Sequence, residues 1–391
     1  MAKRFAIKGL AVLGGLIIST STFAQTNNLD GTVGAASPAV PFLRISPDAR
    51  SGAMGDVGLA ISPDANAQYW NVGKLAMSEK EMGVSVTYTP WLKALGLDDM
   101  FLGYVSAYKK FGENNNQAIS ASLRYFNLGN IDYTTIDATP AGTGKPREFA
   151  FDVGYSRKLS ENLSLGVALR YIHSNIAAGS QDINATYSPG NAFAGDIGVF
   201  YTKTNQISEY NSGTFSFGAQ LSNVGSKISY SNLEKDFIPT NLGIGAAYTY
   251  QIDEYNKITG SLDLNKLLIP SAKYENGKWN RPTESVVGGM LSSFTQAPGG
   301  YGTVISIGGE YWYQDQFAIR AGYFYEHPDN GARQYFTCGL GIKYNTFGLN
   351  FAYLVPAAIN QGDVPNTAKN PLANTLRFSL TFDFDNMKKK G

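Results

Sequence analysis

The sequence predicts an all-β membrane protein: a 14-stranded antiparallel outer-membrane β-barrel with an N-terminal hatch or plug segment. The composition is the first indication, because the 391 residues include 43 glycines, 24 tyrosines and 22 phenylalanines while only 16% are charged. Period-two alternation is the second, as in "LRFSLTFDF" (376–384), where apolar and polar residues take turns. The third is that the connections between such segments are alternately short and long.

The first 24 residues have the pattern of a secretion signal. Lys3, Arg4 and Lys8 give a positive start, "GLAVLGGLII" gives an apolar core, and "STFAQ" gives a small-residue cleavage site. The apolar core is shorter than the about 20 residues that a membrane-spanning helix needs. We therefore expect residues 1–24 to be a signal peptide and the mature chain to be exported. Residues 25–40 are expected to form a flexible N-terminal segment.

Residues 41–81 are predicted to form the hatch. The stretch "PDARSGAMGDVGLAISPDANAQYWN" (47–71) spaces its glycines as G-x-x-G-x-x-G. This is neither the dinucleotide-binding nor the P-loop pattern, so we do not expect nucleotide binding. Glycines instead allow close backbone approach inside a crowded lumen. Ser46 and Ser62, each followed by Pro-Asp-Ala, are expected to begin helices as N-caps, and Trp70 to anchor the hatch by packing.

Fourteen alternating segments follow the hatch, and most are long enough for a tilted strand to cross a bilayer. An even number of strands returns the chain to the side on which it started. The short turns and both termini are therefore assigned to the periplasm, and the long loops to the cell exterior. Residues 82–385 are expected to form the barrel and residues 386–391 a periplasmic tail. The segments are 82–90, 100–111, 117–130, 147–158, 162–174, 192–203, 213–228, 239–250, 257–269, 303–314, 316–327, 334–345, 347–355 and 374–385.

The alternation also predicts a lumen lined by equal numbers of positive and negative side chains. Such a balance favours internal ion pairs and a plug over an ion-selective pore; a wet lumen with solvated charges is the alternative. The wall charges are Arg124, Arg170, Arg320, Lys343, Arg377, Asp152, Asp196, Asp263, Glu310 and Asp383. The residues expected to join hatch and barrel are Asp48, Arg50, Asp56, Asp64, Trp70, Arg124, Asp152, Arg170, Asp196, Glu310 and Arg320.

Charge and residue counts argue against several functional classes. Loss of the three signal-peptide cations lowers the formal net charge from +1 to −2, which leaves no basic surface for nucleic acid. Cys338 is the single cysteine and there are two histidines, so we expect neither a disulfide, a histidine-rich metal site nor a cofactor. His173, predicted to face lipid beside a serine, raises the alternative of an outer-leaflet lipid deacylase. A polar residue at the membrane interface has the same pattern, and we expect no enzymatic activity.

The long loops are the candidates for binding a partner. Exposed aromatic and aliphatic side chains supply much of the binding energy at protein interfaces. The same side chains could instead fold over the barrel mouth or lie at the outer-leaflet interface, and the sequence leaves these alternatives open. The candidates are Trp91, Leu92, Leu95 and Leu97 in residues 90–100, and Tyr274, Trp279, Phe294 and Tyr301 in residues 270–302.

The segment "PFLRISPDARSGAMGDVGLAISPDANAQYWNVGKLA" (41–76) closely resembles the N-terminal segment of the PorV/PorQ family of Bacteroidetes. These are 14-stranded barrels with an N-terminal hatch, within the superfamily of the FadL fatty-acid transporters. "LDLNKLLIP" (262–270), "SSFTQAPGGY" (292–301) and "GGEYWYQDQFAIRAGYFYE" (308–326) extend the resemblance. It runs from Pro41 to Phe384.

The resemblance implies a role in the type IX secretion system. Such a protein would bind the C-terminal signal domain of exported cargo at the SprA (Sov) translocon. It would then carry the cargo to an attachment complex of the sortase-like PorU with PorQ and PorZ, in contact with outer-membrane lipid and lipopolysaccharide. A second hypothesis is a FadL-like transporter of a hydrophobic small molecule. The predicted inner face is mostly Gly, Ser, Asp and Arg, with Ile172 and Phe324 as apolar exceptions near the mouth, which favours the first hypothesis.

Overall fold

The computed structural model describes residues 36–93, 96–134, 137–176, 178, 187–231, 234–296, 302–327, 330–331, 333–357 and 375–385. The predicted signal peptide, residues 25–35 of the predicted flexible segment and the predicted tail lie outside these ranges. Among the helices within them, none has the length and hydropathy needed to traverse a bilayer.

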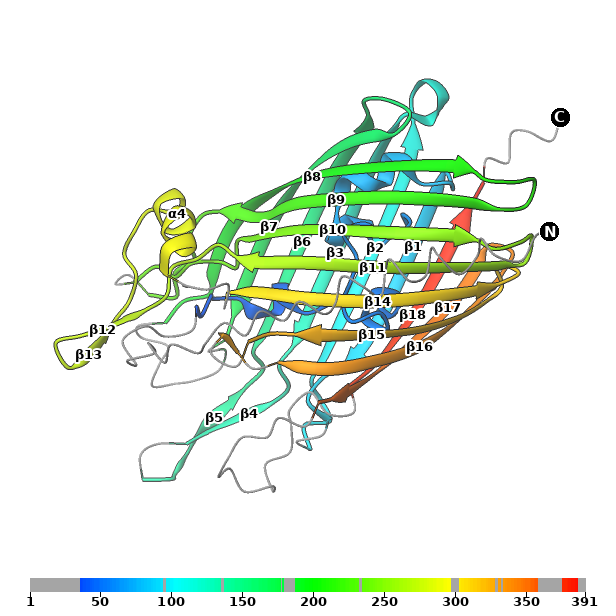
Figure 1. The fold of residues 1–391 in the computed structure, drawn as a ribbon. Coiled ribbons are helices and arrows are strands. Elements are labelled where there is room, and N and C mark those ends of the chain that lie inside the picture. The colour runs from blue at the N-terminus through cyan, green and yellow to red at the C-terminus, as the bar shows by residue number, and fades with distance from the viewer. Residues whose placement is uncertain are drawn as a thin grey trace.

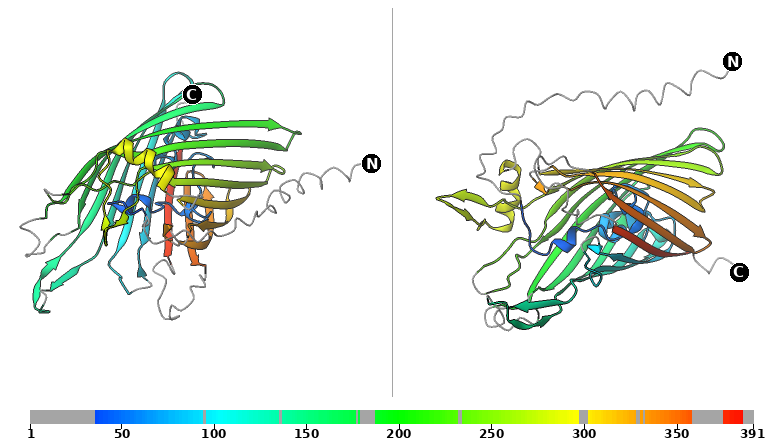
Figure 2. Two further views of the ribbon diagram at one scale, coloured as in Figure 1. Left: turned by 60° about the vertical axis from the view of Figure 1, so that its left-hand side comes forward. Right: turned by 90° about the horizontal axis from the view of Figure 1, so that it is seen from below.

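Fourteen antiparallel strands close into one barrel (Figure 1, Figure 2), which confirms the predicted fold class. Each strand pairs with its neighbours in chain order, and Met82 opposite Phe384 joins the first strand to the last. The strands are β1 (Met82–Pro90), β2 (Phe101–Phe111), β3 (Gln117–Asn127), β6 (Arg147–Lys158), β7 (Leu163–Asn175), β8 (Gly190–Gln206), β9 (Ser212–Gly225), β10 (Asn241–Gln251), β11 (Asn256–Leu267), β14 (Thr303–Tyr313), β15 (Phe317–Tyr325), β16 (Gln334–Tyr344), β17 (Phe347–Pro356) and β18 (Thr375–Phe384).

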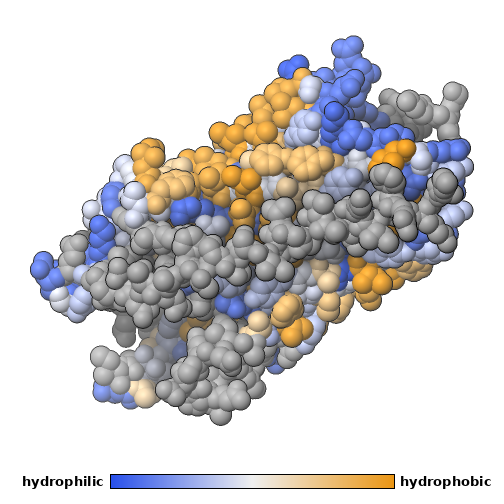
Figure 3. All heavy atoms as spheres, in the orientation of Figure 1, coloured by the Kyte–Doolittle hydropathy of each residue, from blue (hydrophilic) through white to orange (hydrophobic). Residues whose placement is uncertain are grey.

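The alternation of residue types sets the two faces of the wall. In β7 the outward Leu165, Val167 and Leu169 are 39%, 50% and 75% exposed, whereas the inward Ala168 and Arg170 are 3% and 4% exposed. Apolar side chains on the outside suit a lipid environment, and the charged side chains are enclosed within the ring. Figure 3 shows hydrophobic atoms along the outer wall.

The two ends of the barrel differ in their connections. Short turns join β2 to β3, β6 to β7, β8 to β9, β10 to β11, β14 to β15 and β16 to β17, and longer loops join the strands at the other end. The long-loop end carries elements that the alternation of residue types did not predict. Its short strands have three to five residues, which is too few to show a period, and its helix has no period of two. These elements are two hairpins, β4 (Ile131–Thr134) with β5 (Pro140–Gly144) and β12 (Lys273–Glu275) with β13 (Lys278–Asn280), and a helix, α4 (Val286–Gln296).

Residues 40–81, called the inner segment below, run through the lumen (blue in Figure 1). Ala39, directly before it, donates a backbone hydrogen bond to Phe237 in a long loop, and Glu81 at its end accepts one from Lys110 at the short-turn end of β2. The segment therefore spans the barrel from mouth to mouth. Its elements are η1 (Pro41–Arg44), α2 (Ala49–Gly52), α3 (Ala67–Trp70) and η2 (Val72–Met77).

The helix starts expected at Ser46 and Ser62 were wrong. Asp48 is the N-cap of α2, and its carboxylate accepts a hydrogen bond from the Ser51 amide. No helix begins at Ser62, because Asp64 accepts from the Asn66 amide in a local turn and also binds Arg50. Aspartate competes well with serine for such backbone amides.

Gly55 shows why the inner segment is rich in glycine. Its φ angle is +71°, which side chains rarely adopt, and an added Cβ would lie 2.6 Å from the Tyr323 nitrogen and 2.7 Å from the Ile307 oxygen. The backbone of the segment thus lies directly against the backbone of β14 and β15.

Candidate functional site

Arg50 is the best-connected link between the inner segment and the wall. Its guanidinium lies 2.8 Å from Glu310 on β14 and 3.1 Å from Asp64 within the segment. Burial lowers the pKa of Arg50, but the charges of Glu310 and Asp64 outweigh that effect and raise it above its ordinary value. Glu310 also accepts a hydrogen bond at 2.6 Å from Arg320 on the neighbouring strand β15. One wall carboxylate is thereby shared by two buried guanidinium groups.

Two further carboxylates fix the middle of the inner segment. Asp56 accepts a 2.5 Å hydrogen bond from the Tyr335 hydroxyl and lies 3.5 Å from the Arg377 guanidinium. Asp263 on β11 accepts backbone hydrogen bonds from Gly58 at 2.7 Å and Leu59 at 2.9 Å. Hydrogen bonds donated by main-chain amides to a carboxylate hold the segment at a fixed depth in the lumen.

Asp48 and Trp70 contact each other within the inner segment. The Trp70 indole donates a 2.6 Å hydrogen bond to Asp48, so this pair ties α2 to α3 within the inner segment. Burial raises the pKa of Asp48 above its ordinary value. Asp64 likewise forms an ion pair with Arg50 within the segment.

Four other predicted contact residues lie on the wall and are buried. Arg124 reaches the inner segment, because it donates to the Leu43 carbonyl at 2.9 Å and lies 4.4 Å from the centroid of the Tyr69 ring. Arg170 on β7 forms ion pairs with Asp152 on β6 and with Asp196 on β8. These pairs join neighbouring strands, and contact of the three residues with the hatch stays a prediction.

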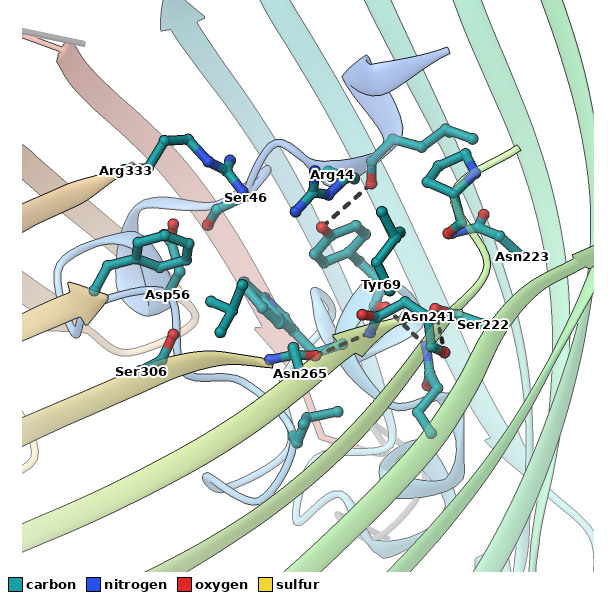
Figure 4. A pocket seen from close by; sticks show the side chains of 18 of the residues that line it. Arg44, Ser46, Asp56, Tyr69, Ser222, Asn223, Asn241, Asn265, Ser306 and Arg333 are labelled. Atoms are coloured by element: carbon teal, nitrogen blue, oxygen red, sulfur yellow. Dashed lines mark hydrogen bonds between the residues drawn. The ribbon is translucent and has the colours of Figure 1, made fainter. Parts of the chain in front are cut away.

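A cavity of about 110 Å³ opens beside the inner segment at the long-loop end (Figure 4). Its rim holds Arg44 and Arg333, which share Glu326 at 3.1 Å and 2.6 Å. Burial raises the pKa of Glu326, but hydrogen bonding and the charges of both arginines hold it below its ordinary value. The hydroxyls of Ser46 and Ser306 are buried without a hydrogen-bond partner among the described residues. Apolar lining comes from Leu43, Leu59, Trp70, Pro239, Leu267, Val304 and Phe324.

The other half of the mouth is filled by apolar side chains. Phe42 of the inner segment packs with Leu102, Phe126, Ile172 and their neighbours in one apolar cluster. Of the two apolar exceptions expected at the mouth, Phe324 lines the cavity and Ile172 belongs to this cluster.

The candidate residues of the first long loop divide between this cluster and the surface. Trp91 and Leu92 are half-buried and pack against the cluster, with the Trp91 ring 6.4 Å from Phe126, so of the two alternatives these residues follow the one in which the loop folds over the barrel mouth. They cover the barrel mouth because apolar side chains beside an apolar lumen are more stable packed than hydrated. Leu97 is 40% exposed, and Leu95 lies outside the described residues.

The second long loop places two of its candidates, Tyr274 and Phe294, on the exposed surface. Tyr274 in β12 is 42% exposed and Phe294 in α4 is 53% exposed. Trp279 belongs to β13, but its side chain lies outside the described part of the structure, as does all of Tyr301. The role of this loop in partner binding stays a prediction.

His173 and Ser174 do not form a nucleophile–base pair. Successive strand residues point to opposite faces: His173 lies against Phe149 and contacts Asn191 at 2.9 Å, whereas the buried Ser174 donates to Glu148 at 2.7 Å. Within the described ranges, no group of three or more His, Cys, Asp and Glu residues is placed to hold a metal ion.

Several solved structures are similar to this chain at low sequence identity. The toluene transporters TbuX of Ralstonia pickettii and TodX of Pseudomonas putida are both 11% identical to this chain, with TM-scores of 0.47 and 0.48; each comparison covers 86% of this chain and 98% of the other. A FadL homologue of Pseudomonas aeruginosa is 11% identical with a TM-score of 0.42, covering 90% of this chain and all of the other. No curated protein matches the sequence significantly.

A family model described as "Type IX secretion system protein PorV" matches residues 29–274. The match covers the inner segment and the wall strands from β1 to β11, and it ends within the β12–β13 hairpin. This is more than half of the chain. The matched region thus includes Arg50 and Asp56 of the inner segment, which form ion pairs with wall residues. It also includes Asp263 of the wall, which accepts a hydrogen bond from the inner segment. The chain belongs to the PorV family of the type IX secretion system, and it is a 14-stranded barrel of the outer membrane.

Proposed function

We propose that this protein binds the C-terminal signal domain of exported cargo at the SprA (Sov) translocon and carries it to the cell-surface attachment complex of PorU, PorQ and PorZ. Membership of the PorV family supports a place in type IX secretion. In this proposal the long loops face the cell exterior, and the short turns, with Met82 and Phe384, face the periplasm. The protein acts as a carrier and not as an enzyme.

One observation carries the proposal: the lumen is occupied by the chain's own inner segment. Phe42, Met54, Ala60, Val72 and Leu75 in this segment are each 0% exposed. The wall around it presents paired charges rather than a continuous apolar path. A protein whose interior is filled in this way must meet a large partner at its outer surface, and the long loops offer the most extensive surface for that.

Leu97 marks a candidate cargo surface on the described loops. It is 40% exposed, and Ile131 at the start of the β4–β5 hairpin is 39% exposed. The two loops are held together because Asp99 accepts a 2.7 Å hydrogen bond from the Asn130 amide. Exposed aliphatic side chains on loops fixed in this way lose little conformational freedom when they enter a partner's pocket.

Capture of an isolated cargo C-terminal domain by the detergent-solubilised full-length protein tests the proposal. We expect Leu97→Asp combined with Ile131→Asp to reduce capture about tenfold, since a charge at an apolar contact must be desolvated. Ile207→Asp is the matched control, because Ile207 is 60% exposed in a short turn at the opposite end. If the wild-type protein captures no cargo domain, the shuttle proposal is contradicted. If Leu97→Asp/Ile131→Asp and Ile207→Asp capture the cargo domain equally well, the cargo surface does not include Leu97 and Ile131.

The mouth cavity favours a second candidate, transport of a hydrophobic small molecule. Leu59, Trp70 and Phe324 give it an apolar side next to the polar rim of Arg44 and Arg333. Uptake of a long-chain fatty acid by a strain that lacks its own transporter tests this function. Rescue that is lost when Val304→Trp fills the cavity would support transport, and absence of rescue by wild type would count against it.

A further inference from the structure

We propose that the exposed apolar side of α4 lies in the lipid interface and holds the long-loop end of the barrel against the membrane surface. Val287, Leu291 and Phe294 form this side, called the α4 stripe below. Their spacing of four and three residues places them along one side of the helix. They are 65%, 67% and 53% exposed.

The opposite side of α4 is covered by protein. A Cβ added at Gly289 would come within 2.7 Å of the Phe237 ring and 2.9 Å of Pro270, and Ser293 is 4% exposed. The helix thus packs closely on the loop that carries Phe237. Its two sides differ sharply, because the three side chains of the stripe are each more than half exposed.

The α4 stripe continues the lipid-facing surface of the barrel. Leu262 and Leu264 face outward on β11 and are 42% and 41% exposed, and Lys266 follows on the same face. The Lys266 ammonium lies 5.6 Å from the centroid of the Phe294 ring. A lysine and an aromatic ring at the end of a lipid-facing row are typical of the membrane–water interface. Figure 3 shows hydrophobic atoms where α4 lies in Figure 1 and along the adjoining wall.

The composition of α4 is suited to such a place and poorly suited to water. Its sequence VVGGMLSSFTQ carries no charge and includes Gly288 and Gly289, which disfavour helix formation. A helix of this length gains most of its stability from the surfaces that cover it. Packing on Phe237 covers one side, and an interfacial position covers the other while leaving polar groups near the lipid headgroups.

Lipid is the occupant that these contacts favour over a protein. The α4 stripe is one side chain wide and joins an established lipid-facing row through Lys266. A protein-docking patch is more often a broad apolar centre with a polar rim. This inference gives Phe294 a lipid role in place of the cargo role that the sequence suggested, and it does not depend on cargo binding.

Depth-dependent quenching tests the inference on the full-length chain in phosphatidylcholine vesicles. A fluorophore is attached to Leu291→Cys in a Cys338→Ser background, because Cys338 is exposed. Lys278→Cys in β13, which is exposed and outside α4, is the control. Phe151→Cys on the outer wall serves as the lipid reference. We expect headgroup-attached nitroxide lipids to quench the label at 291 roughly threefold more than that at 278, and aqueous iodide to show the reverse order.

Two results would overturn the inference. In the first, iodide quenches the label at 291 as strongly as the label at 278 and lipid nitroxides quench both equally, which would place the stripe in water. In the second, the label at 291 is shielded from both quenchers only when another secretion component is added, which would make the stripe a protein-docking surface. The label at Phe151→Cys shows independently that the barrel is inserted.

Discussion

At the scale of residues, the lumen is organised around shared carboxylates. Glu310 accepts from both Arg50 and Arg320, and Glu326 accepts from both Arg44 and Arg333. A buried charge that loses its partner keeps the cost of desolvation without the compensating attraction. The carboxylates are therefore the positions at which a single change disturbs most charge.

Glu310→Gln should be strongly destabilising. The amide leaves Arg50 and Arg320 facing each other without a shared anion, and removal of one partner from a buried ion pair costs about 3–5 kcal/mol. Denaturant titration in lipid vesicles measures the free energy of unfolding. Glu113→Gln, at an exposed turn position, is the control and should match wild type. Equal stability of the two variants would contradict this account of the lumen.

Lys74 provides a prediction of pH dependence. Its ammonium is buried and donates to the Gly58 carbonyl at 2.7 Å, and burial lowers its pKa to about 8 from 10.5. Between these values the unfolded chain binds more protons than the folded one, so the Lys74 contribution to stability rises with pH. The penalty is fully present below pH 8 and disappears above pH 10.5. The stability difference between Lys74→Met and wild type should therefore change across this window, favouring the variant less as pH rises. A difference independent of pH would show that Lys74 is not buried as a cation.

At the scale of elements, the contact between the inner segment and the wall is backbone against backbone. A Cβ added at Gly322 would lie 2.1 Å from the Met54 carbonyl carbon and 2.2 Å from the Gly55 nitrogen. Neither atom belongs to a flexible side chain, so no rotamer change relieves the contact. Small residues on β15 therefore set how closely the segment approaches.

Gly322→Ala should displace the inner segment while leaving the strands paired. Overpacking of this kind costs about 1–3 kcal/mol, and we expect faster proteolysis within residues 47–71 at unchanged β-sheet circular dichroism. Gly260→Ala on β11 is the matched control, because a Cβ there meets no atom within 4 Å. Protection of the segment that is equal in both variants would argue that the wall adjusts instead.

The strands could be predicted from the sequence because one face of each strand meets lipid and the other meets the lumen, so apolar and polar residues alternate with a period of two along every strand. The short hairpins and α4 escaped this prediction, since three to five residues show no period and α4 contains adjacent glycines. The sequence predicted which charged residues face the lumen, but not which of them form ion pairs with each other. Alternation places Arg170 and Glu310 inside, but whether each reaches a strand neighbour or the inner segment depends on the register between strands, which residue order alone does not give.

At the scale of the whole molecule, the occupied lumen predicts a closed barrel. With the inner segment bound through Glu310 and Asp263, wild type should show little steady conductance in planar bilayers. Glu310→Ala combined with Asp263→Ala removes both attachments and should raise the open probability by about tenfold, as expected when a charge-held plug is released. The Glu113→Ala variant, altered at an exposed turn, should stay closed. A wild-type barrel that conducts steadily would mean that ions pass beside the segment.

Residues 40–81 pass from one mouth of the barrel to the other, so the closed ring of strands surrounds an N-terminal part of its own chain. β1 continues directly from the segment, and β18, the last strand to be made, closes the ring beside it. An inner segment that is already in place as β18 joins β1 needs no threading step. Folding should therefore be a wrapping process, in which a curved sheet gathers around its N-terminal chain and the final strand locks that chain inside.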